Sequence, residues 1–443
     1  MQGELHGTIG ILGFGVDGRG VAEFLEGIDD VDRVVVFDDA MNNEQLTLLR
    51  QGSAGQVMNN NGRLFLGENL DGVDLLFRSP GFPLNHDLVK QAKEKNIPIT
   101  SSTAQVLEKF EGITVGVTGS NGKTTCVALI EEFLKAEFGE DQVERGGNDG
   151  VPRLDLIRPS PSPSPKYLVL ELSSFQLIDC PASPNVAVVL NISPNHLDWH
   201  ADMDEYVEAK RQIISRQSGT GVSPVRSNGR PARSQGDIAI LNPNDEIVKS
   251  FANGLKSEVR WFEDNVPKEV KCITHPDTIK AAVTTACTLN VSEANIEKVL
   301  REFPGVPHRL EFIRELDGVK FYNDSSCTTP ESAITACKAF PKGSLVLLLG
   351  GRDKGMDFSR LYEVIKEQDV AVVPYGEMAE VFKKNITTHY SLLTTHSFEE
   401  AINTARSTGR KNVALSPACA SFDMFKNAKE RGKRFAEIVK SFK

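Results

Sequence analysis

Short apolar stretches alternate with segments of helical periodicity along most of the chain. Ten stretches are short and almost continuously apolar, which predicts buried β-strands: Ile9–Leu12, Val34–Phe37, Leu75–Phe77, Ile113–Val117, Leu168–Leu172, Val186–Leu190, Ile238–Leu241, Leu345–Leu349, Ala371–Val373 and Val413–Leu415. Between the strands, apolar residues recur at helical spacing, as in Val127, Ile130, Phe133, Leu134 and Phe138. Strands of this kind separated by helices are typical of parallel sheets covered on both faces. The pattern therefore predicts the α/β fold class.

The chain has 443 residues, which is too long for one hydrophobic core, so we expect two or three domains. One boundary is predicted near residue 102, just before a strand. The other is predicted at Phe303-Pro304-Gly305-Val306-Pro307, where two prolines and a glycine end a helical segment. The Ser- and Pro-rich stretch 159–165 and the Arg-bearing stretch 215–236 are expected to be surface insertions, because neither can bury enough apolar surface to order itself.

Composition narrows the class of protein. The formal net charge is −10 and no basic stripe is evident, so we do not expect a nucleic acid as a main partner. The seven cysteines are scattered and form no Cys-x-x-Cys pair, which suits reduced thiols in a cytosol. No signal-peptide pattern and no apolar run of about 18 residues occurs, so we expect a soluble, cytoplasmic protein without a membrane partner.

A Gly-rich turn follows the first predicted strand. It reads Gly13-Phe14-Gly15-Val16-Asp17-Gly18, and Asp38 ends the second strand about 20 residues later, as in dinucleotide-binding folds. The same turn can hold any diphosphate at a helix N-terminus, or it can be a purely structural tight turn. A second turn, Arg78-Ser79-Pro80-Gly81, closes the third strand. Two such turns at one sheet edge favour a nucleotide-diphosphate site.

The most informative segment joins the strand Ile113–Val117 to a helix through Thr118-Gly119-Ser120-Asn121-Gly122-Lys123-Thr124-Thr125. Glycines let the backbone wrap phosphates, Lys123 can reach the outer phosphates, and Thr124 can place its hydroxyl on Mg²⁺. Only two residues separate Gly119 from Gly122, whereas the common template has four before Gly-Lys. The turn predicts a nucleoside triphosphate site of a particular subclass.

Further candidate groups lie downstream. Glu171 stands within an apolar strand, where either a metal or cation or an ion pair with a surface lysine would be its partner. The next strand runs into a turn that contains His196 and His200, at the carboxyl edge where α/β proteins place their sites. Lys210 follows on a helix, and its sequence context alone predicts a solvated side chain.

Together these motifs resemble those of the Mur ligases. Besides the Gly119 turn, the matching blocks are Leu170-Glu171-Leu172-Ser173-Ser174-Phe175-Gln176-Leu177, Asn195-His196-Leu197-Asp198, Gly305-Val306-Pro307-His308-Arg309, Asn323-Asp324-Ser325, Leu348-Leu349-Gly350-Gly351 and Leu415-Ser416-Pro417-Ala418-Cys419-Ala420-Ser421-Phe422-Asp423. They occur in order over nearly the full length. The Glu-Leu-Ser-Ser-Phe-Gln and Ser-Pro-Ala-Cys-Ala-Ser blocks resemble the branch that adds D-glutamate, whereas the phosphate turn is shared with folylpolyglutamate synthase.

The resemblance implies three domains and one reaction. The domains are a Rossmann-like UDP-binding domain at 1–101, a central ATPase at 102–305, and a Rossmann-like domain at 306–443 that binds D-glutamate and part of ATP. In the implied reaction, ATP phosphorylates the L-alanyl carboxylate of UDP-N-acetylmuramoyl-L-alanine, and the amine of D-glutamate then displaces phosphate. A carboxylate becomes a good electrophile only once its oxygen is a phosphate leaving group, and cations must offset the charge that gathers there. A monomer is expected.

The resemblance also implies a role for individual residues. The implied catalytic residues are Lys123, Asn148, His196 and Lys210, with Asn148 at the acyl phosphate. Two Mg²⁺ ions would be held by Thr124, Glu171, His196 and Lys210, the last as N6-carboxylysine. ATP would contact Gly119, Ser120, Asn121, Gly122, Lys123, Thr124, Thr125, Arg309 and Asp324. The UDP end would contact Gly15, Val16, Asp17, Asp38, Asp39, Ser79, Pro80 and Gly81. D-glutamate would contact Thr328, Lys354, Ser421 and Phe422, and His308 would be a hinge.

The sequence departs from the family pattern at several positions. Ser326 stands where many members carry Lys, and Asp39-Ala40 lacks an Arg that some relatives use near uracil. The adenine-side motif reads His275-Pro276-Asp277-Thr278-Ile279 instead of His-Asn followed by a second Asn. Three alternatives stay open: an NAD-dependent oxidoreductase built on the Gly13 turn, a nucleotide-binding module whose ATPase has decayed, and a sister Mur ligase or folylpolyglutamate synthase.

Overall fold

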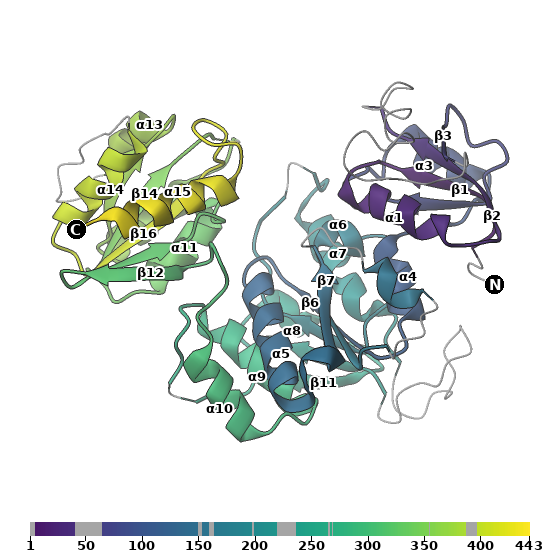
Figure 1. Cartoon of the computed structure of the whole chain (residues 1–443), viewed down its shortest axis with the longest axis horizontal. Coiled ribbons are helices and arrows are strands. Elements are labelled where there is room, and N and C mark those ends of the chain that lie inside the picture. Colours follow the sequence, from purple (N-terminus) through teal and green to yellow (C-terminus); the bar gives the residue numbers. More distant parts are fainter. Residues whose placement is uncertain are drawn as a thin grey trace. The chain divides into compact units, whose positions relative to one another are not determined.

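The computed structural model describes residues 5–39, 64–148, 153–158, 164–196, 199–218, 236–264, 266–267, 269–353, 355–386 and 397–443. Most of both predicted surface insertions, as well as Ala40, Asp198 and Lys354, lie outside the described residues. The chain forms two compact units. The first unit comprises Met1–Lys123, Ile130–Glu263 and Ala281–Val291, and the second comprises Thr124–Leu129, Asp264–Lys280 and Ser292–Lys443. The first unit carries two sheets and the second carries one (Figure 1).

The N-terminal sheet is parallel throughout. Its strand order is β3 (Leu64–Leu66), β2 (Val31–Phe37), β1 (Gly7–Leu12), β4 (Leu75–Arg78) and β5 (Ile99–Thr100). Alternate residues of β2 point to opposite faces, as the pleat requires. Val34 and Val36 join the core beneath α1 (Val16–Glu26), whereas Val35 and Phe37 join the core beneath α3 (Asp87–Glu94). Helices therefore cover both faces.

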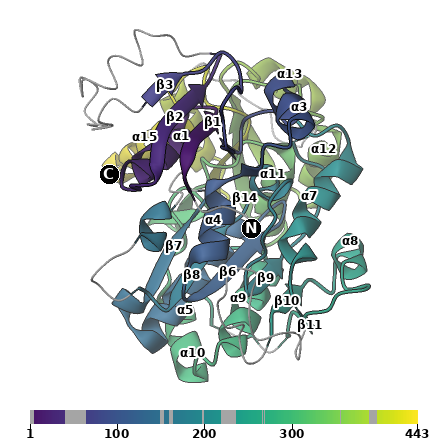
Figure 2. The same ribbon diagram turned by 90° about the vertical axis from the view of Figure 1, so that its right-hand side faces the viewer.

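The central sheet has six parallel strands and contains the Gly-rich phosphate turn. The strand order is β11 (Glu258–Trp261), β10 (Ile238–Leu241), β9 (Val186–Val189), β6 (Ile113–Thr118), β8 (Tyr167–Glu171) and β7 (Val143–Gly147). Figure 2 shows these strands side by side. Because β6 lies between β8 and β9, the turns that follow these three strands meet at one carboxyl edge.

The third sheet, in the second unit, has the order β12 (Glu311–Leu316), β13 (Val319–Asn323), β16 (Asn412–Ala418), β14 (Leu345–Gly350) and β15 (Ala371–Tyr375). Four strands are parallel, but β12 pairs antiparallel with β13, so the expectation of purely parallel sheets is wrong here. The cause is the two-residue Asp317-Gly318 turn, in which both residues have positive φ (52° and 78°), the geometry that closes a hairpin.

Helices also cover both faces of the third sheet. On one face lie α11 (Pro330–Lys338), α12 (Ser359–Glu367) and α13 (Ala379–Asn385), and on the other lie α14 (Phe398–Ser407) and α15 (Ala428–Ser441). The remaining helices are α4 (Ser102–Lys109), α5 (Lys123–Phe138), α6 (Ser174–Leu177), α7 (Met203–Ser215), α8 (Glu246–Ser250), α9 (Pro276–Thr288) and α10 (Glu293–Glu302), with short 3₁₀ turns at Glu140–Gln142 and Leu154–Ile157.

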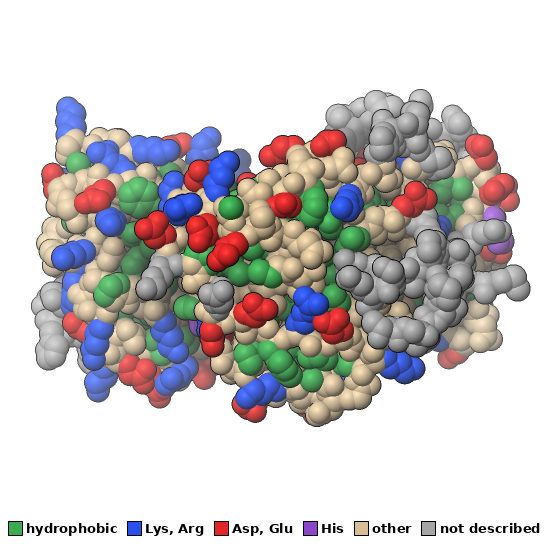
Figure 3. Space-filling view, turned by 90° about the horizontal axis from the view of Figure 1, so that it is seen from below, with side chains coloured by type: hydrophobic (Ala, Val, Ile, Leu, Met, Phe, Trp, Pro, Cys, Tyr) green, Lys and Arg blue, Asp and Glu red, His purple; other side chains and the backbone are tan. Residues whose placement is uncertain are grey.

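The α/β fold class is confirmed, and each of the ten predicted strands occurs with both ends within three residues of its expected range. The two predicted domain boundaries stay predictions, since the first two sheets fall in one unit. Over the described ranges, every helix is too short or too polar to serve as a membrane span. On the face shown in Figure 3, described Lys and Arg side chains are interspersed with Asp and Glu.

Candidate functional site

The phosphate turn is shaped by two glycines with positive φ and by one asparagine from the neighbouring strand. Gly122 (φ 86°) is the N-cap of α5, and a Cβ on Gly119 (φ 154°) would lie 2.9 Å from the Leu190 side chain. Asn191, just after β9, accepts from Ser120 N at 2.8 Å and exchanges hydrogen bonds with Asn121 at 3.0 Å. The turn is thus held open at the N-terminus of a 16-residue helix, where N–H groups and the helix dipole favour an anion.

Lys123 and Lys210 converge on the same carbonyl. The Nζ atom of Lys123 donates to Gly119 O at 2.9 Å and to Ser120 O at 3.2 Å. Lys210 Nζ also donates to Gly119 O at 2.9 Å, with a weaker contact to Thr118 Oγ1 at 3.5 Å. Both amines therefore lie at the phosphate turn.

Lys210 is buried, so the expectation of a solvated side chain is wrong. Only 2% of the residue is exposed, and its Nζ lies 4.8 Å from the centre of the Tyr206 ring, one helical turn earlier on α7. Tyr206 in turn shares a hydrogen bond of 2.9 Å with Ser120 Oγ. Burial, helped by the nearby charge of Lys123, lowers the pKa of Lys210 well below its ordinary value. This amine therefore favours the neutral form.

Glu171 ends β8 at the same edge and is 7% exposed. Its Oε1 accepts from Asn148 Nδ2 at 3.3 Å, and its backbone oxygen accepts from Asn148 N at 2.9 Å. In the described part of the chain it forms no ion pair with a surface lysine, so that alternative has no support. The carboxylate is held by an amide and stands beside the phosphate turn, since β8 pairs with β6 up to Val117.

The two histidines of the following turn differ in their surroundings. His200 is buried between Ser174 Oγ (2.9 Å from Nε2) and Glu205 (3.2 Å from Nδ1). His196 is exposed, has a φ of 56°, and packs edge-on against Phe175 with ring centres 4.9 Å apart. The ring positions leave His196, rather than His200, on the solvent side of the turn.

The N-terminal sheet carries a second candidate site at its Gly-rich turn. Asp38 Oδ2 accepts from Phe14 N at 2.6 Å, and Ser79 Oγ donates to Gly13 O at 2.8 Å, so the two predicted turns contact each other. A Cβ on Gly18 would clash with Gly13 O, which explains the need for glycine there.

The other residues predicted for the UDP end differ in exposure. Asp39 is almost fully exposed, Val16 is 64% exposed, and Pro80 and Gly81 lie next to Ser79 in the second turn. The Asp17 carboxylate instead accepts a hydrogen bond from Ser102 Oγ of α4, and burial raises the pKa of Asp17. Its charge is thereby disfavoured at the very helix N-terminus where a diphosphate would bind.

In the second unit, His308 and Arg309 lie against the loop that follows β13. His308 Nδ1 contacts Asn323 Nδ2 at 2.8 Å, and Arg309 donates to Ser326 O at 3.3 Å. Asp324 is buried, accepts from Ser416 Oγ at 2.7 Å, and has its pKa raised to about 6 by that burial.

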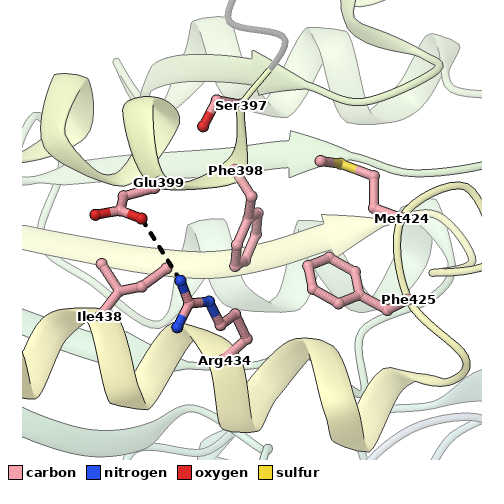
Figure 4. A pocket seen from close by; sticks show the side chains of 7 residues that line it. All are labelled: Ser397, Phe398, Glu399, Met424, Phe425, Arg434 and Ile438. Atoms are coloured by element: carbon pink, nitrogen blue, oxygen red, sulfur yellow. Dashed lines mark ion pairs between the residues drawn. The ribbon is translucent and has the colours of Figure 1, made fainter.

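The residues predicted to contact D-glutamate lie on loops at the carboxyl edge of the third sheet. Thr328 follows β13, whereas Ser421 (2% exposed) and Phe422 (58% exposed) follow β16. A hollow of about 220 Å³ lies behind the Ser421 loop and is lined mainly by apolar side chains, with one ion pair between Glu399 and Arg434 at 3.6 Å (Figure 4). None of the residues predicted to contact ATP, Mg²⁺ or D-glutamate lines this hollow.

Four residues to which the sequence assigned no role shape these sites. Asn191 had a signal, since it is polar and directly follows an apolar strand, and Tyr206 lies four residues before Lys210 on one helix face. Arg78 and Arg431 had none, because both are buried arginines that bond to residues distant in sequence, Asp179 and Ser325 respectively. Arg431 donates to Ser325 and to Cys419 O and thereby joins the loops after β13 and β16.

Comparisons with known proteins agree with this arrangement. The family described as Mur ligase middle domain matches residues 117–291. The UDP-N-acetylmuramoylalanine–D-glutamate ligase of Clostridium acetobutylicum is 33% identical over 98% of this chain and 96% of its own length, and that of Acetivibrio thermocellus is 34% identical over 98% and 96%.

Solved structures support the same fold. The MurF ligase of Thermotoga maritima in complex with ADP superposes with a TM-score of 0.56 at 19% identity, covering 92% of this chain and 94% of that one. FolC of E. coli in complex with DHPP and ADP gives a TM-score of 0.52 at 15% identity, covering 76% and 92%. Sequence identity of 33–34% over 98% of the chain, together with the shared fold, shows that the chain belongs to the Mur ligase family, in the branch of the UDP-N-acetylmuramoylalanine–D-glutamate ligases.

Proposed function

We propose that this protein joins D-glutamate to UDP-N-acetylmuramoyl-L-alanine at the cost of ATP, through an acyl phosphate, and releases ADP and phosphate. The observation that carries the proposal is the grouping of Lys123, Lys210 and Glu171 around the Gly119 turn. A triphosphate site alone needs only the turn and Lys123. The buried Lys210 and Glu171 add ligands for the cations that carboxylate phosphorylation requires.

The phosphate turn binds the β- and γ-phosphates of ATP. N–H groups of residues Gly119 to Thr125 and the amine of Lys123 donate to phosphate oxygens, which replace the carbonyl oxygens that Lys123 now contacts. Arg309 and Asp324 of the second unit bind the nucleotide, Asp324 through the ribose hydroxyls.

Mg²⁺ fits the chemistry of the groups at this edge. Thr124 offers a hydroxyl in the first turn of α5, Glu171 a buried carboxylate, and His196 an exposed imidazole. Within the described ranges, no three His, Cys, Asp or Glu side chains cluster as a metal site. Two ions would therefore draw on ligands of other kinds, among them phosphate oxygens and N6-carboxylysine at Lys210. When bound, Mg²⁺ neutralises the charge that develops on the transferring phosphoryl group.

Lys210 suits carbamate formation because its lowered pKa favours the neutral amine. A neutral amine adds to CO₂ and loses one proton, so a neutral side chain becomes a carboxylate-like anion. Its position on the Gly119 carbonyl puts that ligand beside the phosphate turn. Asn148, hydrogen-bonded to Glu171, is placed to donate to the acyl phosphate.

The substrates are bound by loops of the other two sheets. Gly15, Val16, Asp38, Asp39 and the Ser79-Pro80-Gly81 turn bind the UDP end, with Asp17 behind them. Thr328, Lys354, Ser421 and Phe422 receive D-glutamate, since a lysine with hydroxyl donors suits a dicarboxylate. The domains are 1–101, 102–305 and 306–443, and His308 acts as the hinge into the third. The protein acts as a cytoplasmic monomer.

One assay tests the proposal. Purified protein is incubated with ATP, Mg²⁺ and UDP-N-acetylmuramoyl-L-alanine, and phosphate release is measured with D-glutamate, with L-glutamate and with no amino acid. We expect release that depends on D-glutamate. Release with L-glutamate only, or none with any amino acid, would remove the assignment, and NAD reduction with a hydroxy substrate would favour the oxidoreductase instead.

A further inference from the structure

Arg78 is an arginine whose donors are all engaged within the protein. It ends β4, is 1% exposed, and its guanidinium makes two hydrogen bonds to the carboxylate of Asp179, from Nε at 2.5 Å and from Nη2 at 2.6 Å. Nη2 also donates to Phe175 O at 2.9 Å. The third nitrogen, Nη1, donates to Ser79 O, Pro80 O and Phe82 O at 3.0–3.2 Å. A buried charge with this many partners is held in one geometry.

The partners of Arg78 lie in two segments of the first unit, one that follows a strand of the N-terminal sheet and one that follows a strand of the central sheet. Ser79, Pro80 and Phe82 form the turn after β4, which we propose binds the UDP end. Asp179 and Phe175 lie at α6, the short helix that follows the Glu171 strand. The Phe175 ring packs against His196 with centres 4.9 Å apart. Arg78 therefore joins the substrate-anchoring turn to the helix that borders the proposed metal ligands.

A second chain of contacts runs parallel to the first. Asp17 of α1 bonds Ser102 of α4, and Thr103 of α4 accepts from Gln176 Nε2 of α6 at 3.3 Å. The side chain of Gln176 also accepts from Ser173 N, two residues after Glu171. Both routes end at α6, so α6 is one element that connects the N-terminal sheet to the reacting edge of the central sheet.

We propose that Arg78 and Asp179 are positioning residues, which set the distance from the UDP anchor to the carboxylate that is phosphorylated. The inference rests on the proposed function of the two sites. The substrate is long and is held at one end, so a shift of the anchor relative to α6 displaces the reacting carboxylate by a similar amount. A displacement of about 1 Å costs on the order of 100-fold in rate.

Substitutions of Asp179 and Arg78 can distinguish an effect on UDP binding from an effect on the position of the reacting carboxylate. Asp179→Asn removes the negative charge that pairs with Arg78 at α6 but leaves Arg78 on the three carbonyls of the turn. We expect UDP, measured by calorimetry, to bind with wild-type affinity within about twofold, whereas kcat falls by about 10- to 100-fold. Arg78→Lys keeps a cation but cannot reach all six acceptor atoms, so both UDP affinity and kcat should fall.

The control is Asp369→Asn in the second unit, where Arg410 makes a similar two-nitrogen contact with Asp369. It should lower stability without changing kcat or UDP affinity. Wild-type kcat in a folded Asp179→Asn protein would overturn the proposal, and so would an equal loss of UDP affinity and kcat in that variant. If Asp179→Asn does not fold, wild-type kcat in Arg78→Lys decides against it. A wild-type protein without D-glutamate-dependent phosphate release would instead refute the proposed function.

Discussion

Gly147 offers the sharpest test of how the fold holds Glu171. Gly147 ends β7 beside Glu171 and has a φ of 107°, a conformation that side chains rarely adopt. A Cβ at this position would overlap Glu171 O and lie 2.9 Å from Glu171 N. Both clashing atoms are backbone, so neither can rotate away. Gly147→Ala must therefore push β7 away from β8 at the residue that is proposed to bind Mg²⁺.

The loss of stability has two contributions, the unfavourable φ and a lost hydrogen bond, and the displacement of β7 adds an effect on the rate. Reaching ordinary contact distance requires a local separation of about 1 Å. The unfavourable φ costs about 1–3 kcal/mol, and loss of the hydrogen bond from Asn148 N to Glu171 O costs about 1 kcal/mol more. A destabilisation of about 2–4 kcal/mol corresponds to a fall in Tm of about 5–10 °C for a unit of this size. Displacement of Glu171 by about 1 Å should lower kcat on the order of 100-fold.

The assay combines thermal unfolding with D-glutamate-dependent phosphate release over a range of Mg²⁺ concentrations. We expect the Mg²⁺ concentration for half-maximal rate to rise in Gly147→Ala, because a misplaced carboxylate binds the ion less well. The control is Gly254→Ala, since Gly254 has a φ of 76° but no atom lies within 4 Å of the place that its Cβ would take. It should lose about 1–2 kcal/mol from backbone strain alone and keep its Mg²⁺ dependence. Equal Tm and equal Mg²⁺ dependence in the two variants would refute the reasoning.

Three further predictions concern single side chains. Lys210→Ala should lose activity, and bicarbonate or short carboxylic acids should partly restore it; full activity without them would remove the carbamate. Tyr206→Phe, which deletes the hydroxyl 2.9 Å from Ser120 Oγ, should cost about 1 kcal/mol and raise the KM for ATP several-fold, as measured by steady-state kinetics. Burial raises the pKa of Asp324 from 3.8 to about 6, so ionisation opposes folding by about 3 kcal/mol above pH 6 and not at all below the unfolded pKa. Asp324→Asn should accordingly unfold at a higher temperature at pH 7.5, and calorimetry should show the gain disappearing as the pH falls towards 4; a gain independent of pH would contradict this.

The strands and the phosphate turn could be predicted because their signals are local. Continuously apolar stretches such as Leu345–Leu349 leave few alternatives to a buried strand. Strands with mixed polarity were not predicted. β7 contains Glu144 and Arg145 at the sheet edge, and half of the residues of β12 are charged, although Asp317-Gly318 carried a hairpin signal.

The environment of Lys210 could not be predicted from its neighbours in sequence. Glu208 and Arg211 flank it, and such a helical segment normally faces water. Its burial depends on β6 and on the turn at Gly119, 91 residues away in sequence. The contact between Arg78 and Asp179 spans 101 residues and depends on how α6 leaves β8. Contacts between residues this far apart in sequence form only in the assembled fold. The local sequence pattern around either residue therefore does not predict them.

The two lysines at Gly119 connect the fold to the proposed chemistry. Both amines donate to one carbonyl at 2.9 Å, where two ammonium groups would repel each other. Burial lowers the pKa of Lys210, and loss of its proton would relieve this repulsion. In the proposed reaction with CO₂ the neutral amine would be the reacting form, and a protonated Lys123 beside it would stabilise the negative charge of the carbamate. The burial that makes Lys210 unfavourable as an ammonium ion thus makes it favourable as the precursor of a metal ligand, which a solvated lysine at the same position would not be.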